Sequence, residues 1–125
     1  MRALLSLLIV TTLTGAAEAD TRLPHCFMQS QMDGWRAADG KTVYIRANVS
    51  RYYRLDLSRE CTILTEPDAH LILRTFGVSL ICSATDFRLS AGQSGPAGFV
   101  EPCFMKKLTE LSPEEAAALP RKVRP

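Results

Sequence analysis

Four cysteines constrain the fold of this 125-residue chain more than any other feature. They are Cys26, Cys61, Cys82 and Cys103. An even number of widely spaced cysteines in an exported chain is typical of disulfide bonds, which stabilise a domain too small for a large core. Four cysteines allow three pairings, and the sequence alone does not select one. We expect a nested arrangement, Cys61 with Cys82 and Cys26 with Cys103, because the outer bond would join both ends of the folded region.

The beginning of the chain has the features of a signal peptide. A short positive start precedes a largely apolar run over residues 3–13, and Ala17-Glu18-Ala19 places small residues at both positions that signal peptidase reads. We therefore expect a signal peptide over residues 1–19 with cleavage near Ala19, before Asp20, and a periplasmic or secreted protein. A spanning helix would need about 20 apolar residues. A lipoprotein would need a cysteine in place of Ala16.

The cysteine and histidine spacing argues against a metal site. Structural zinc sites and thiol-redox sites use close C-x-x-C pairs, and no such pair occurs here. The only histidines, His25 and His70, lie far apart in the sequence. We therefore expect no bound metal and no cofactor.

A period-two pattern follows, which is typical of half-buried strands. Asp39-Gly40 is a turn signal between a segment around Trp35 and a strand over residues 41–47. A further strand is expected over residues 52–57, so these segments predict a three-stranded meander. With the strands expected further along, residues 20–110 predict an all-β domain, a small antiparallel barrel or sandwich.

The rest of that domain contains shorter segments separated by turn signals. We expect strands near residues 71–76, 79–83, 87–89 and 99–108, the last interrupted at Pro102, and a glycine-rich loop over residues 91–98. The run 71–76 is also compatible with a helix, because short apolar runs are ambiguous.

The last segment, residues 111–125, has a helix signal and a basic tail. Ser112 as N-cap, Pro113 in the first turn and Glu115 closing a capping box predict a short helix that ends before Pro120. We expect the basic residues that follow it to be disordered.

The order of residues in the mature chain resembles a known family. The shared framework is Cys26, Trp35 before a turn, Val43 in a strand, Tyr53 and Leu55, and then Cys61, Cys82 and Cys103. On these residues the chain resembles the bacterial domain-of-unknown-function family DUF6491, whose members are small exported proteins and often lipoproteins. The resemblance implies an exported domain framed by four cysteines. It implies no activity and no ligand.

No catalytic motif is visible in the sequence. The G-x-S-x-G pattern is absent, and Ser94 lies in the glycine-rich loop rather than between a strand and a helix. Neither histidine has a neighbouring partner in the sequence that would position it as a base. We expect a non-enzymatic protein with no catalytic residues.

The most suggestive candidate for binding is a tyrosine–arginine face. If the meander forms, four side chains share the face opposite its buried residues: Tyr44, Arg46, Tyr52 and Arg54. Tyrosine and arginine are enriched in recognition surfaces, but cross-strand pairs of this kind also cover ordinary solvated sheets. The formal charge of +2 is too small to imply nucleic-acid binding.

These observations favour a periplasmic or secreted domain that binds or supports another envelope component. The alternatives are an inhibitor of a secreted hydrolase, which would use the loop over residues 91–98, and an enzyme of unrecognised type.

Overall fold

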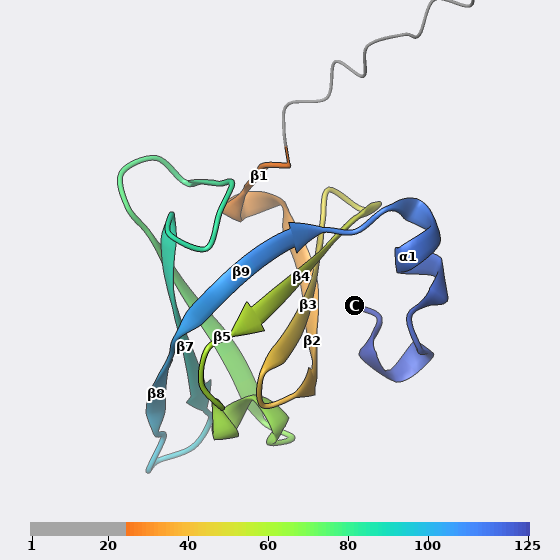
Figure 1. The fold of residues 1–125 in the computed structure, drawn as a ribbon. Helices are drawn as coiled ribbons and strands as arrows, with labels where there is room; N and C mark the ends of the chain where they lie inside the picture. Colours follow the sequence, from red (N-terminus) through yellow and green to blue (C-terminus); the bar gives the residue numbers. More distant parts are fainter. Residues whose placement is uncertain (1–24) are drawn as a thin grey trace, which may run out of the picture.

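A computed structural model describes residues 25–125, and the expected signal peptide and its cleavage site lie outside the described residues. The expected all-β architecture is confirmed (Figure 1). The largest sheet, in the order β2-β3-β4-β9, comprises Met32–Asp39, Thr42–Ala47, Arg51–Leu57 and Met105–Glu110. The second, β5-β7-β8, comprises Ala69–Thr75, Phe87–Gln93 and Val100–Cys103. A small third sheet pairs β1 (Phe27–Met28) with β6 (Leu80–Ile81).

In the described part of the chain every strand pairing is antiparallel, and these sheets do not close into a barrel. Short helices complete the fold: the 3-10 helices η1 (Gln29–Gln31), η2 (Thr62–Thr65) and η3 (Arg121–Val123), and the helix α1 (Pro113–Ala118). No helix among residues 25–125 is long and apolar enough to cross a membrane.

The predicted meander is β2-β3-β4, and its turn forms as the sequence indicates. The Asp39 carboxylate accepts a hydrogen bond from the Lys41 backbone N–H at 2.8 Å, which fixes the turn between β2 and β3. The alternating pattern then sends Val43, Ile45 and Leu55 fully into the core. Burying each such side chain stabilises the fold by about 1.5–3 kcal/mol.

The core lies between the two larger sheets, which face one another (Figure 1). Phe87 and Leu89 of β7 meet the meander residues there, and Phe27 of β1 packs on Tyr53 with ring centroids 4.6 Å apart. Residues 71–75 of the run over 71–76 belong to strand β5, which resolves the choice between strand and helix, and Phe76 follows the strand.

The disulfides are Cys26–Cys82 and Cys61–Cys103, so the expected nested pairing is wrong. β1 pairs with β6, not with the end of the domain, and its register sets Phe27 opposite Ile81. Their neighbours Cys26 and Cys82 therefore come together.

The second bond follows from the pairing of β4 with β9. Leu57 lies opposite Met105, which brings Cys61 beside Cys103. The two bonds are interleaved along the chain, with separations of 56 and 42 residues. By loop-closure entropy each contributes about 4 kcal/mol.

Two segment boundaries also differ from those expected. Strand β7 continues to Gln93, through part of the expected loop, because it pairs with β5 on one side and β8 on the other. The strand expected over residues 99–108 is interrupted at Phe104 rather than at Pro102. At Phe104 the chain passes from the β5-β7-β8 sheet to the largest sheet. Pro102 is tolerated because β8 is an edge strand.

The C-terminal helix is confirmed, but the expected disorder of the basic tail is wrong. Ser112 Oγ accepts from the Glu115 N–H at 3.1 Å, and the Glu115 carboxylate accepts from the Ser112 N–H at 3.2 Å. After Pro120 the chain turns back as η3 and buries Val123. Arg124 donates to the carbonyls of Ala117 and Leu119, at 2.7 and 2.6 Å, which satisfies the end of the helix.

Candidate binding face

The structure places the four candidate residues together on the outer face of the largest sheet. Tyr44 lies directly opposite Arg54, and Arg46 lies opposite Tyr52. Their neighbours along both strands point into the core, so these side chains point away from it. Their role in binding stays a prediction.

The C-terminal segment packs over part of this face, because α1 contacts β4 and η3 contacts β2, and the chain end lies beside β2 (Figure 1). The Leu111 N–H donates to the Tyr52 carbonyl at 2.8 Å, which leads the chain from β9 onto the face. Further along, the carbonyl of Pro125 accepts from the Arg46 guanidinium at 3.4 Å. This cover was not expected, because the basic tail was predicted to be disordered.

A small hollow remains between the helix and the sheet. It has a volume of about 260 Å³ and is lined by Tyr44, Arg54, Leu111, Glu115, Ala118 and Leu119. Tyr44 and Arg54 therefore form the boundary between the covered part of the face and the open part.

The open part is a groove of about 730 Å³ at the end of the sheet where β3 begins and β4 ends. Its lining is Asp39, Lys41, Thr42, Asp56, Leu57, Ser58, Lys106 and Lys107. The side chain of Arg54 reaches Asp56 at its margin, with Nε donating to Oδ1 at 2.9 Å. Three lysines against two aspartates give the lining an excess of positive charge, which favours an anionic ligand.

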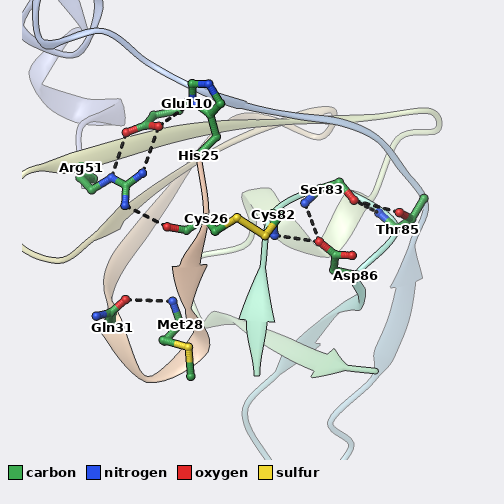
Figure 2. The surroundings of a disulfide bond; sticks show 10 residues. All are labelled: His25, Cys26, Met28, Gln31, Arg51, Cys82, Ser83, Thr85, Asp86 and Glu110. Carbon is green, nitrogen blue, oxygen red and sulfur yellow. Dashed lines mark hydrogen bonds and ion pairs between the residues drawn. A yellow bond between two sulfur atoms is a disulfide. The ribbon is translucent and has the colours of Figure 1, made fainter. Parts of the chain in front are cut away.

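His25 has a carboxylate partner that the sequence analysis did not identify (Figure 2). Its Nδ1 lies 2.8 Å from Glu110 Oε2, but the His25 side chain is 77% exposed. Arg51 holds the same carboxylate, with Nε donating to Oε1 at 2.9 Å, and this bond holds the pKa of Glu110 below its ordinary value. The contact partner lies 85 residues away along the chain, so no local signal could have revealed it.

His70 lies on the outer face of the other larger sheet, against the backbone of Gly92. A Cβ at Gly92 would come within 2.5 Å of the imidazole Nε2, so only glycine leaves room for the ring in this position. His25 precedes β1 and lies against Glu110, whereas His70 is in β5 and lies against Gly92.

The Cys26–Cys82 bond is held by backbone contacts on both sides (Figure 2). Arg51 donates to the Cys26 carbonyl at 2.9 Å. Asp86 accepts from the N–H groups of Cys82 and Ser83, at 2.8 and 2.7 Å, and the bond from Cys82 is the main cause that lowers the pKa of the Asp86 carboxyl. This network anchors the disulfide in place and is structural in character.

Within residues 25–125, no group of three or more histidine, cysteine or acidic side chains is arranged to hold a metal ion. Ser94 lies in the exposed connection between β7 and β8, away from both histidines in the sequence.

No curated protein and no solved structure matches the chain. A family model does match, and it covers residues 1–125, which includes the four-cysteine framework. The chain therefore belongs to DUF6491, a family of unknown function.

Proposed function

We propose that this protein is a non-enzymatic binding domain that works outside the cytoplasm and holds an acidic segment of another envelope component. The two disulfides are compatible with an extracellular or periplasmic location. The observation that carries the proposal is the lysine-lined groove beside Tyr44 and Arg54.

The groove has the properties of a recognition site for carboxylate groups. Lys41, Lys106 and Lys107 are exposed, and each ammonium can reach a ligand without breaking a core contact. The strands beneath them are fixed by the pairing of β3, β4 and β9, so a ligand meets a rigid floor. Preformed sites of this kind lose little entropy on binding.

The non-enzymatic part of the proposal rests on the surroundings of the histidines. His25 is open to water, and its partner Glu110 is already bound by Arg51. A general base works with a positioned partner and a substrate beside it. The exposed imidazole ties the start of the domain to β9 instead.

The groove is tested by titration with a peptide of six glutamates, followed by backbone NMR. We expect shifts at Lys41, Thr42, Asp56 and Lys107, and none with a peptide of six lysines. Lys106→Gln/Lys107→Gln should weaken binding by about tenfold or more, at roughly 1 kcal/mol per lost charge pair. Arg121→Gln/Lys122→Gln removes the same charge elsewhere and should bind as wild type. Equal affinity in both variants would refute the groove.

Affinity capture from envelope extracts tests the wider face. If wild type and Tyr52→Ala/Arg54→Ala retain the same proteins, the tyrosine and arginine side chains do not contribute to recognition.

One observation favours a second candidate, an inhibitor of a secreted hydrolase. The connection between β7 and β8 is an exposed hairpin loop, closed by the Gln93 N–H to Phe99 carbonyl bond at 3.0 Å. Phe99 at the end of this loop and Val100 at the start of β8 are 68% and 62% exposed. Deleting residues 94–98 should abolish inhibition of a co-secreted hydrolase and leave glutamate-peptide binding unchanged.

A further inference from the structure

Four exposed apolar side chains lie at one end of the molecule. Phe76 and Val78, in the loop after β5, are 54% and 74% exposed. Leu80 begins β6 and lies opposite Met28 of β1, and each is 38% exposed. Apolar side chains that gather at one exposed place mark an interaction site more often than scattered ones do.

Two arginines lie directly behind this apolar tip. Arg74 of β5 and Arg88 of β7 are opposite one another, and both are exposed. Like charges in this position destabilise a sheet. Neither arginine makes an ion pair with any side chain of residues 25–125. The two positive charges repel one another, and an anion that lies against both of them would relieve this repulsion.

Arg88 and Phe76 join the arginine pair to the tip. The Arg88 guanidinium lies over the Phe76 ring, 5.4 Å from its centroid. The Phe76 N–H donates to the Asp86 carbonyl at 3.1 Å, and this bond holds the first residue of the tip against the start of β7.

The base of the tip is rigid. The Cys26–Cys82 bond and the Asp86 hydrogen bonds fix the chain just after Leu80 (Figure 2). Gly77 turns the chain at a φ of +73°, and nothing packs within 4 Å of the place where its side chain would be. The segment between β5 and β7 projects beyond the strand ends beside β1 (Figure 1). The apolar side chains are thus displayed outward instead of folding back on the core.

We propose that this surface, Met28, Arg74, Phe76, Val78, Leu80 and Arg88, docks the domain on an anionic lipid bilayer. The apolar tip enters the boundary of the acyl chains, and the two guanidinium groups behind it meet the lipid phosphates. Once the tip is inserted, its apolar side chains lie at the depth of the acyl chains and the guanidinium groups behind it lie at the depth of the lipid phosphates, which matches the layering of a bilayer. The proposal is independent of the lysine groove, which lies on the other large sheet.

Co-sedimentation with lipid vesicles tests the proposal. The full chain from Asp20 onward should partition onto vesicles of equal parts phosphatidylcholine and phosphatidylglycerol. It should partition much less onto vesicles of phosphatidylcholine alone. Each arginine near an anionic surface contributes about fivefold to partitioning, so Arg74→Gln/Arg88→Gln should reduce it by about 25-fold. Raised salt should weaken wild-type binding and leave that variant little changed.

A matched pair of variants separates the tip from general surface properties. Phe76→Ser/Arg88→Gln should lose partitioning by about tenfold or more. Phe104→Ser/Arg59→Gln is its control, because the Arg59 guanidinium lies over the half-exposed Phe104 ring at 5.2 Å in the same way. Circular dichroism melts establish that each variant is folded.

Equal partitioning of both variants, or equal binding of wild type to neutral and anionic vesicles, would overturn the proposal. So would a wild type that ignores every vesicle but is captured by an acidic protein through Arg74 and Arg88. The glutamate-peptide titration reports on the groove separately, so failure of one surface is distinguishable from failure of the other.

Discussion

Arg51 and Glu110 join β4 to the end of β9 by two hydrogen bonds, Nε to Oε1 at 2.9 Å and Nη2 to Oε2 at 3.1 Å. The same guanidinium reaches the Cys26 carbonyl, and the same carboxylate reaches His25. One ion pair therefore connects the largest sheet to the start of the domain and to its first disulfide.

Removing one partner of this pair should destabilise the domain. Glu110→Gln leaves the Arg51 guanidinium without its anion, and charge-assisted hydrogen bonds contribute about 1.5–3 kcal/mol. Urea unfolding measures the loss. The matched control is Asp56→Asn, because Arg54 and Asp56 have the same 2.9 Å contact but Arg54 is more exposed. That substitution should cost less than about 1 kcal/mol. Equal losses would show that burial of the Arg51 pair adds nothing.

Acid should destabilise the protein in part through the same carboxylate. Hydrogen bonds from Arg51 hold the pKa of Glu110 below its ordinary 4.5 in the folded protein. As the pH falls, the unfolded chain therefore takes up a proton before the folded protein does. The stabilisation is complete above about pH 4.5 and is lost as the pH falls through the lowered pKa of the folded state. The Cys82 N–H is the main cause that lowers the pKa of the Asp86 carboxyl from 3.8, so this group acts in the same direction. Unfolding free energy should decline below about pH 4.5. Glu110→Gln should make that decline shallower.

Alkali should act through Tyr53, whose burial raises its pKa from 10.0 to about 12. The folded state holds the phenol neutral while the unfolded chain ionises, so stability is full below pH 10 and is lost as the pH rises toward 12. The Tyr53 hydroxyl is buried and has no hydrogen-bond partner among the described residues.

Tyr53→Phe should remove that sensitivity. Loss of an unpaired buried hydroxyl should leave stability at neutral pH unchanged or raise it by about 1 kcal/mol. Unfolding curves of wild type and Tyr53→Phe, recorded at neutral pH and above pH 10, measure the difference in stability. A large destabilisation at neutral pH would show that the hydroxyl has a partner in solution.

The disulfide pairing can be read directly by peptide mapping without reduction. We expect one linked pair of peptides containing Cys26 and Cys82 and another containing Cys61 and Cys103. Cys61→Ala/Cys103→Ala should lower the unfolding free energy by about 4 kcal/mol. A peptide pair joining Cys61 to Cys82 would contradict the strand pairing of β1 with β6.

Local features of the sequence predicted local structure well. The Asp39-Gly40 turn and the Ser112–Glu115 capping box each act over a few residues, and both form as expected. The disulfide pairing depends instead on β1 meeting β6, more than 50 residues away along the chain, and no local pattern encodes that contact.

The candidate face also combines a local, predictable part with a part that depends on distant contacts. Alternation along β3 and β4 was enough to place Tyr44 and Arg54 on the side away from the core. The cover over that face was not predictable, because a short basic tail after a two-turn helix has no strong intrinsic preference for structure. Its order comes from burial of Val123 and from contacts that Arg124 makes with the helix end.

Releasing this tail should open the tyrosine–arginine face. Val123→Asp places a charge at a site only 7% exposed, and the cost of burying an unpaired carboxylate exceeds what so short a segment gains by packing. We expect faster hydrogen exchange at residues 119–124 and new solvent access at Arg46, while the β-sheet amides keep their protection. Lys122→Asp changes the exposed neighbour and should leave exchange unchanged. Because the cover and the groove meet at Tyr44 and Arg54, a tail that regulates binding would also make Val123→Asp bind the glutamate peptide more tightly. Unchanged affinity with a released tail would show that the open groove is the whole of the site.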